Sequence, residues 1–132
     1  MHSFPTKIGE GIHRVEAVTV VCGADVAVCI GGGERHHIGA AALAVPRPSL
    51  QDQEKVSATA SVICATGHKE DELARWAALK LAASLNCRVN VTAGLHIDGA
   101  AASDFDKLTG NFQRVVEVIE NTLIKELAPQ YC

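Results

Sequence analysis

Three short stretches of the chain combine glycine with histidine where an apolar run of residues ends. The first, Gly31–Gly39, has the sequence GGGERHHIG and follows an apolar run that ends at Ile30. Consecutive glycines add nothing to a core and lose the most backbone entropy on folding, so another group is expected to come close to the backbone there. A second apolar run, Ala40–Val45, begins directly afterwards. We therefore expect the polar residues between the two runs to lie on a bend between two strands.

The second stretch, Thr66–Lys69, lies between a predicted strand and a predicted helix, and the third, Thr92–Asp98, ends another predicted strand. Each again pairs a glycine with a histidine. We expect the three turns to converge on one pocket that binds a small anionic or aromatic ligand. Because adjacent residues of an extended chain point to opposite sides, His36 and His37 cannot both face this ligand without a bend, and of the two we favour His37. The residues predicted to contact it are Gly31, Gly32, Gly33, Arg35, His37, Gly39, His68, Lys69, Gly94 and His96.

The glycine bend offers the better of two predicted sites for a phosphate group. Backbone N–H groups of Gly31–Gly33, together with the cations Arg35 and Lys69, would hold an anion. The helix that begins after the second stretch adds a favourable dipole. However, the acidic run Glu70–Glu72 lies in the same first turn and repels a phosphate.

The histidines of the three turns also suit a metal site, which is the competing interpretation. Its ligands would be His37, His68, His96 and Asp98, since neutral imidazoles and a carboxylate suit zinc or iron(II). No HxH or HxxxH spacing on one element supports this site, and a metal does not require the glycines. A purely structural assembly chaperone, a third interpretation, leaves the glycines and the histidines without a role. Elemental analysis of the purified protein distinguishes a metal site from a ligand pocket.

The composition predicts one domain, residues 1–132, with a core of small side chains. The chain has 132 residues, of which 48% are apolar and only 4% aromatic. A formal net charge of -3 without a polybasic block argues against a general nucleic-acid binder. The chain does not start with a basic segment followed by a long apolar one, and no apolar run approaches membrane-spanning length. We therefore expect a soluble cytoplasmic protein.

The five cysteines form no CxxC pair and no familiar zinc spacing. Cys22, Cys29 and Cys64 lie in apolar strand runs, and Cys87 lies near the end of a predicted helix. We expect these four to be small packing residues, whereas Cys132 lies at the chain terminus.

Hydrophobic periodicity predicts five strands and two helices. Valine-rich or alternating runs indicate strands at Ile12–Cys22, Val26–Ile30, Ile38–Val45, Ser57–Cys64 and Arg88–Thr92. An apolar stripe of helical period from Leu73 to Leu85 indicates the first helix, and a stripe from Phe105 to Leu123 indicates the second. Ser103 with Asp106 resembles a capping box at the start of the second helix.

The order β-β-β-β-α-β-α predicts an α+β fold in which two helices cover one face of a five-stranded, mostly antiparallel sheet. The first three strands are expected to form a meander that stops at Pro46. The fourth and fifth strands keep a second, mildly polar face, which is either solvated or packs against a second copy by two-fold symmetry. Of these two alternatives we favour a homodimer. The residues of this face are Ser57, Thr59, Ser61, Asn90 and Thr92.

The motifs of the three turns are informative in combination. They comprise Gly32, Gly33, His37, Ile38, Gly39, His68, Lys69, Thr92, Ala93, Gly94 and His96. Together they resemble a known family, the small prenylated-flavin chaperones of the LpdD type, which accompany decarboxylases of the UbiD family. The order and spacing of the motifs relative to the strands agree across nearly the whole chain. His36 stands where the family pattern has a proline.

The resemblance implies an α+β dimer similar in fold to proteasome assembly chaperones. It further implies that the chain binds reduced prenylated flavin mononucleotide (FMN) and passes it to an apo-decarboxylase of the UbiD family, supporting the maturation of that enzyme. No catalysis by the chain itself is implied. A flavin nucleotide requires a phosphate site, hydrogen bonds to its ring and an approach free of side chains, and the three turns are compatible with these requirements.

Overall fold

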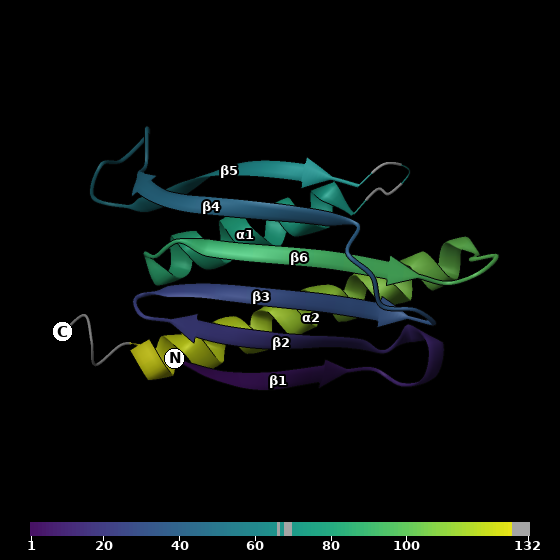
Figure 1. The fold of residues 1–132 in the computed structure, drawn as a ribbon. Coiled ribbons are helices and arrows are strands. Elements are labelled where there is room, and N and C mark those ends of the chain that lie inside the picture. Colours follow the sequence, from purple (N-terminus) through teal and green to yellow (C-terminus); the bar gives the residue numbers. More distant parts are fainter. Residues whose placement is uncertain (66, 68–69, 128–132) are drawn as a thin grey trace.

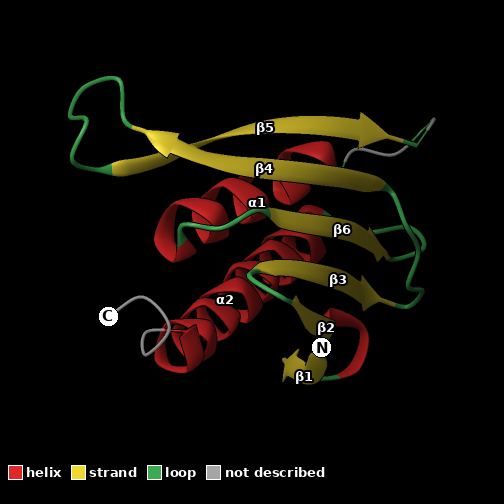
Figure 2. Ribbon diagram, turned by 60° about the vertical axis from the view of Figure 1, so that its left-hand side comes forward, coloured by secondary structure: helices red, strands yellow, loops and turns green. Residues whose placement is uncertain are grey.

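The computed structural model describes residues 1–65, 67 and 70–127 of the chain, which form one sheet covered by helices (Figures 1 and 2). The six strands of this part are β1 (His2–Ile8), β2 (Val15–Cys22), β3 (Asp25–Gly33), β4 (Ala40–Pro48), β5 (Val56–Cys64) and β6 (Val89–His96). The long helices are α1 (Asp71–Leu85) and α2 (Ala102–Leu127), and one turn of 3-10 helix, η1 (Gly11–His13), precedes β2.

The strands follow the order β1-β2-β3-β6-β4-β5 across the sheet. The central pair, β3 and β6, is parallel, whereas every other neighbouring pair is antiparallel. Since β5 is antiparallel to β4 and β4 is antiparallel to β6, the strands β3, β5 and β6 point in the same direction. Their carboxyl ends therefore lie together along one edge of the sheet, which runs across the strands and is distinct from the outermost strands β1 and β5. Both long helices cover the same face, because α1 packs against β4, β5 and β6 and α2 packs against β1, β2 and β3 (Figures 1 and 2).

The predicted α+β fold with two helices on one face is confirmed, but the described part of the sheet has six strands rather than five. The additional strand is β1, whose sequence HSFPTKI contains a proline and shows little apolar alternation. Pro5 is tolerated because β1 pairs only with β2 and forms an edge of the sheet. An edge strand buries few side chains, so its apolar pattern is weak.

The predicted meander of the first three strands is wrong. β4 lies next to β6 and β5, because β6 is inserted between β3 and β4. On β4, the residues paired with β6 run only from Ala40 to Ala44. Pro46 and Pro48 therefore need no N–H group on that side, and β4 continues through both prolines while paired with β5.

Small side chains let α1 lie close to the sheet, since its buried face consists of Ala74, Ala77, Ala78, Leu81, Ala82 and Leu85. In α2 the largest fully buried side chain is Phe112. The predicted capping box is wrong, because α2 begins at Ala102 and the Asp104 carboxylate accepts a hydrogen bond from the Ala101 N–H at 2.9 Å. Within the described residues, neither α1 nor α2 combines the length and the apolar character needed to cross a membrane.

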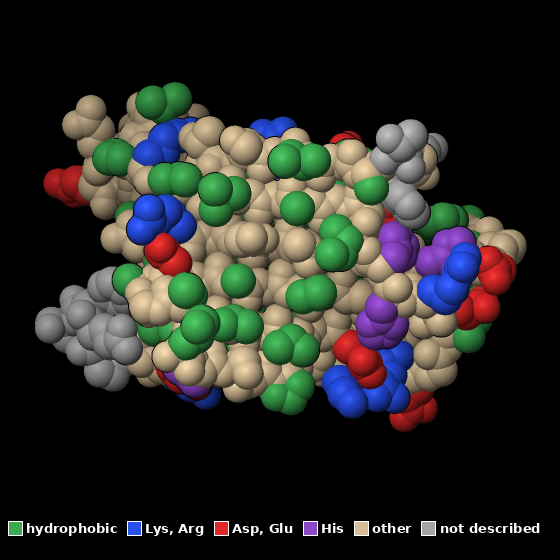
Figure 3. All heavy atoms as spheres, viewed as in Figure 1, with side chains coloured by type: hydrophobic (Ala, Val, Ile, Leu, Met, Phe, Trp, Pro, Cys, Tyr) green, Lys and Arg blue, Asp and Glu red, His purple; other side chains and the backbone are tan. Residues whose placement is uncertain are grey.

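The face of the sheet opposite the helices, which we call the open face, is seen directly in Figure 3. The polar residues that the sequence analysis assigned to a second face lie on it together with apolar ones. On neighbouring strands, for example, Leu43 is paired with both Ser61 and Asn90. The large apolar residues that are exposed on this face are Val18, Leu43, Val45 and Ile63.

The prediction that the cysteines are packing residues holds for Cys87 but is wrong for three others. Cys22, Cys29 and Cys64 are exposed, because strand alternation places the first two on the open face and the third ends the edge strand β5. Burial, with a smaller contribution from the Asp25 carboxylate, raises the pKa of the Cys87 thiol to about 11. Cys132 lies outside the described residues.

Candidate functional site

Three segments lie at the edge of the sheet where β3, β5 and β6 end (Figure 1). They are the loop 34–39, which leads to β4, the start of α1 with Glu70, and the segment 97–101, which leads to α2. Sheets with parallel strands commonly bind ligands where strands end and the connections diverge. Figure 3 shows histidine side chains gathered at this end of the open face, next to both basic and acidic side chains.

The glycines at this edge make room for the chain itself. A side chain on Gly94 would collide with the backbone carbonyl of His37, and a side chain on Gly31 would lie 2.5 Å from the His36 ring. The loop 34–39 therefore lies directly over the ends of β3 and β6, where only glycine leaves enough space. Backbone hydrogen bonds hold both ends of this loop on β6.

Gly31, Gly32 and Gly33 belong to β3 and not to a bend, which corrects the expected geometry of the phosphate site. They lie between β2 and β6, and the Gly33 N–H donates to the Arg14 carbonyl at 3.1 Å. Gly31 and Gly32 are buried. Their N–H groups do not form an open cradle, and the bend that carries polar side chains is the loop 34–39.

Within the loop, His37 forms a shielded pair with Glu70, which we call the inner couple. The His37 Nε2 lies 2.8 Å from the Glu70 Oε1, and their side chains are only 22% and 10% exposed. The same Oε1 accepts the Leu95 N–H at 3.3 Å, at a point where β6 has passed the end of its pairing with β4. A side chain on Gly39 would collide with this carboxylate. Glu70 thus joins the β3–β4 loop, the start of α1 and the end of β6.

His96 and Asp98 form a second, accessible pair, which we call the outer couple. The His96 Nε2 lies 2.7 Å from the Asp98 Oδ1, and the two side chains are 35% and 73% exposed. The Arg35 Nη2 lies 2.8 Å from the same ring nitrogen and 3.6 Å from the Asp98 Oδ1. The hydrogen bond from His96, followed by the charge of Arg35, holds the pKa of the Asp98 carboxyl below its usual value.

The outer couple cannot satisfy all of its partners at once. A ring nitrogen either donates or accepts a hydrogen bond. When the His96 Nε2 donates to Asp98, it cannot accept from Arg35, whose guanidinium group then keeps donors for another acceptor. Since 68% of the Arg35 side chain is exposed, an anion from solution can reach it.

The histidines of the two couples line an open cavity of about 300 Å³, which we call the polar cavity. The ring centroids of His37 and His96 are 6.2 Å apart, with an angle of 82° between the ring planes. The residues that line the polar cavity are Arg35, His36, His37, Ile38 and His96.

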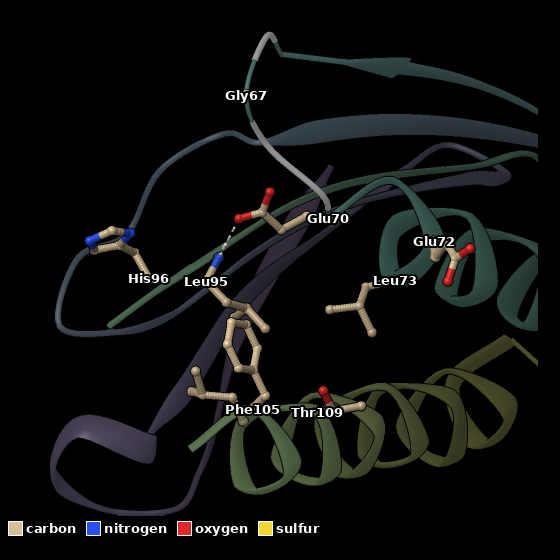
Figure 4. Close-up of a pocket in the computed structure, with 9 residues that line it drawn as sticks. Gly67, Glu70, Glu72, Leu73, Leu95, His96, Phe105 and Thr109 are labelled. Atoms are coloured by element: carbon tan, nitrogen blue, oxygen red, sulfur yellow. Dashed lines mark hydrogen bonds between the residues drawn. The ribbon is translucent and has the colours of Figure 1, made fainter. Parts of the chain in front are cut away.

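A larger cavity of about 480 Å³ lies between the start of α1, the end of β6 and the start of α2 (Figure 4). We call it the apolar cavity, because four of its lining side chains are hydrocarbon. His96 also lines it and thus borders both cavities. Both volumes are of the size found in small-molecule sites. The residues that line the apolar cavity are Gly67, Glu70, Glu72, Leu73, Leu95, His96, Phe105, Leu108 and Thr109.

Several of these residues have no sequence pattern that marks them as part of a site. Leu73, Phe105 and Leu108 belong to the apolar stripes of helices, and Glu70 is expected from the sequence only to repel a phosphate. The signal that was available is the position of Glu70, next to a turn that also contains a glycine and a histidine. Leu95 likewise stands between Gly94 and His96.

Two of the predicted contact residues, His68 and Lys69, lie outside the described residues. The competing metal site includes His68, so the structure describes only its other three proposed ligands, His37, His96 and Asp98. Among the residues that the structure describes, no group of three or more His, Cys, Asp or Glu side chains is arranged to hold a metal ion. His37, His96 and Asp98 therefore do not form such a group by themselves.

A sequence model of the prenylated flavin chaperone LpdD-like domain matches residues 9–124. The chain belongs to this family. The match spans all three turns and both couples, and it confirms the resemblance on which the sequence analysis relied. Among curated protein sequences, none matches the chain.

The fold of this LpdD-like chain is similar to that of a chain in the "Crystal Structure of a Novel Chaperone Complex for Yeast 20S Proteasome Assembly". The TM-score is 0.58, the sequence identity is 15%, and the alignment covers 96% of this chain and 97% of the other. The predicted similarity to a proteasome assembly chaperone is thus confirmed for the fold. At this identity the likeness concerns the fold alone.

Proposed function

We propose that this chain binds reduced prenylated FMN and delivers it to a UbiD-family decarboxylase. The observation that carries the proposal is the position of His96, which borders a polar cavity beside an exposed arginine and an apolar cavity between two helices. A prenylated flavin nucleotide has matching parts: an anionic phosphate, a ring with hydrogen-bonding groups and added hydrocarbon. Membership of the LpdD-like family supports the same ligand.

The described residues suit such a ligand by their chemistry. The Arg35 guanidinium group can donate two parallel hydrogen bonds to a phosphate. In doing so it would leave Asp98, with which it now shares a contact of 3.6 Å. His96 can then donate to the ligand or keep its hydrogen bond to Asp98, depending on its tautomer. His37 has less freedom, because Glu70 holds its Nε2 in a shielded position.

The openness of the outer couple supports a role in delivery. Arg35 and Asp98 are largely exposed, and they stand at the edge of the sheet rather than inside the fold. A ligand held there remains within reach of a second protein. We therefore propose that the decarboxylase approaches this edge to receive the flavin.

The delivery step is tested by loading the chain with reduced prenylated FMN under anaerobic conditions and mixing it with an apo-decarboxylase of the UbiD family. We expect the flavin absorbance to move to the decarboxylase fraction on gel filtration, and decarboxylation to begin faster than with free ligand. Equal rates from the free and the carried ligand would remove the case for delivery.

We further propose that a second copy of the chain covers the open face. Val18, Leu43, Val45 and Ile63 are exposed there, and Thr59 lies among them. The variant Thr59→Arg would bring charges together across a two-fold interface, at a cost of several kcal/mol, about what removing a buried pairing costs. Light scattering is expected to show a dimer for the wild type and a monomer for Thr59→Arg. The control, Ser103→Arg, changes an exposed residue on α2 and should keep the wild-type mass.

A further inference from the structure

β5 is one of the two outermost strands of the sheet, and it pairs only with β4 (Figures 1 and 2). Outermost strands carry backbone N–H and C=O groups that lack a partner strand, and proteins usually protect them with prolines or lysines. β1, at the other end of the strand order, has both in Pro5 and Lys7. The sequence of β5, VSATASVIC, contains neither a proline nor a charged residue. The side of β5 that faces away from β4, which we call the outer side, is therefore open to another strand.

The pairing with β4 determines which backbone groups of β5 point to the outer side. The Ala65 N–H donates to the Gly39 carbonyl, and the Ser49 N–H donates to the Lys55 carbonyl, each at 2.8 Å. Hydrogen-bonded pairs alternate along an antiparallel ladder, so these two bonds and the register assign the odd-numbered residues of β5 to β4. The even-numbered residues direct their N–H and C=O groups to the outer side, where no described strand pairs with them. They are Val56, Ala58, Ala60 and Val62.

The outer side of β5 leads to the candidate site. β5 points in the same direction as β6, so its carboxyl end lies at the edge that carries the outer couple. Only β4 separates β5 from β6, and neighbouring strands are about 4.8 Å apart, so a strand added to β5 would lie within about 15 Å of β6. A second copy that covers the open face leaves the outer side of β5 uncovered.

The side chains of β5 also define the chemistry of a matching strand. Val62 is paired with the buried Ala42, so the even-numbered side chains lie on the face that the helices cover. Val56 and Val62 are exposed there although both are apolar. Since β5 carries no charged side chain, it offers nothing to pair with a charge on a neighbouring strand.

We infer that the decarboxylase docks by adding an extended segment of its own chain along the outer side of β5. This inference rests on the proposed function and names the contact by which the receiving enzyme is recognised. In strand addition, main-chain hydrogen bonds supply the affinity and side chains supply the specificity. The outward groups from Val56 to Val62 pair with a segment of about seven residues. This segment is uncharged and rich in β-branched residues, as suits a strand beside β5.

Residue-resolved amide hydrogen exchange tests the inference on the chain alone and on its complex with an apo-decarboxylase of the UbiD family. An added strand protects the amides that point outward, so we expect exchange at Ala58, Ala60 and Val62 to slow at least about tenfold in the complex. The amides of Thr59 and Ser61 point to β4 and should exchange slowly in both samples. This period of two distinguishes strand addition from docking through side chains.

Two results of the exchange experiment would overturn the inference. Unchanged exchange at the three outward amides in a complex that does form would mean that the decarboxylase docks elsewhere. Slow exchange at these amides in the chain alone would assign the outer side of β5 to a second copy.

Val62→Pro removes one outward N–H group and leaves the ladder with β4 intact, because prolines are tolerated at such positions. Its matched control is Ser3→Pro on β1. The bond from the Gly33 N–H to the Arg14 carbonyl sets the register alternation, and Ser3 likewise points its N–H away from the sheet. We expect the dissociation constant of the decarboxylase to rise at least about tenfold in Val62→Pro, since a carbonyl of the added strand loses its donor. Ser3→Pro should keep the wild-type value.

A second pair of variants keeps the test decisive if Val62→Pro does not fold, which thermal melting shows. Val62→Lys places a charge beside the added strand, and Val118→Lys makes the same change at an exposed valine of α2. We expect Val62→Lys to weaken binding of the decarboxylase about threefold or more and Val118→Lys to leave it unchanged.

Flavin binding separates the failure of this inference from the failure of the proposed function. Every variant leaves the outer couple intact, so each should bind reduced prenylated FMN with wild-type affinity. If the wild type transfers its flavin and the Val62 variants do so equally well, strand addition is wrong and the proposed function stands. If the wild type binds neither the flavin nor the decarboxylase, both are wrong. Wild-type flavin affinity with weakened decarboxylase binding in the Val62 variants supports both.

Discussion

The inner and the outer couple have the same chemistry, a histidine beside a carboxylate, but they differ in their access to solvent. The inner couple, His37 with Glu70, is shielded, and its carboxylate also accepts a backbone N–H from β6. The outer couple, His96 with Asp98, is open and shares its ring nitrogen with Arg35. The inner couple therefore holds the loop 34–39, the start of α1 and the end of β6 together, whereas the outer couple offers groups that a ligand can engage.

The difference in exposure also sets the energetic scale of each couple. Removing one partner of a buried hydrogen bond leaves a desolvated donor or acceptor, which costs about 1–3 kcal/mol. An exposed ion pair contributes about 0–1 kcal/mol, because water screens it and replaces its partners. Changes at the inner couple should thus appear in stability, and changes at the outer couple should appear in binding.

The largest effect is expected from Gly94→Ala, which breaks the inner couple by displacing its loop. The new methyl group would collide with the His37 carbonyl, so the loop 34–39 must move off β6. We expect the free energy of unfolding to fall by about 3 kcal/mol, as for an overpacked site, measured by chemical denaturation.

The matched control is Gly110→Ala in α2, where an added methyl group meets no atom within 4 Å. Replacing glycine by alanine inside a helix should raise the free energy of unfolding by about 1 kcal/mol. If both variants changed stability in the same direction, the close contact between Gly94 and the loop would not be a feature of the folded protein.

The next prediction compares the loss of stability when each of the two carboxylates is removed. Glu70→Ala removes the acceptor of both His37 and the Leu95 N–H, and we expect it to lower the free energy of unfolding by about 2 kcal/mol. Asp98→Ala removes the exposed carboxylate of the outer couple and should leave the free energy of unfolding close to the wild-type value. Equal losses in the two variants would show that exposure does not distinguish the couples.

A smaller effect, confined to binding, is expected from His96→Ala. We expect the dissociation constant of reduced prenylated FMN to rise about tenfold, equivalent to about 1.4 kcal/mol, while the melting temperature stays close to the wild-type value. His2→Ala serves as the control, since His2 is the first residue of β1 and lies at the end of the strands away from the site. Unchanged affinity in His96→Ala would show that the outer couple does not bind the ligand.

The smallest effect concerns the titration of Asp98. Its pKa is lowered from the ordinary value of 3.8 by the hydrogen bond from His96 and by the charge of Arg35. Because the folded pKa lies below the unfolded one, the couple contributes stability above the unfolded pKa, and this contribution is lost as the pH falls through the folded pKa. Carboxyl NMR titration should show the low pKa in the wild type and a rise toward the ordinary value in His96→Ala. If the pKa of Asp98 were the same in His96→Ala and in the wild type, the hydrogen bond from His96 would not be the cause of the low pKa.

The elements whose residues are strongly patterned could be predicted from the sequence. The alanine-rich stripe of α1 and the alternation in β5 depend on local periodicity, and both elements were found. The pairing of β3 with β6 could not be predicted in the same way, because it joins residues that are far apart in sequence. Because β6 pairs with β3, β4 lies beyond β6 and not next to β3. The predicted meander of the first three strands is wrong for this reason.

The residues of the candidate site likewise include some that local sequence could predict and some that it could not. His37 and His96 could be singled out because they stand next to glycines at strand ends. The part played by Glu70 could not, because its partners come from a loop and from a strand that only the folded sheet brings together. Phe105 has the spacing of a core residue, and the sequence pattern does not show that this residue is 61% exposed.

The central claim is that the ligand engages the outer couple while the inner couple keeps its place. It is tested most directly by imidazole 1H–15N correlation spectra of the wild type, recorded during an anaerobic titration with reduced prenylated FMN. We expect the ring signals of His96 to shift in a saturable manner, the Nε2 signal of His37 to keep the position typical of its bond to Glu70, and the signals of His2 to stay unchanged. Bound flavin with unmoved His96 signals, or no binding at all, would contradict the account.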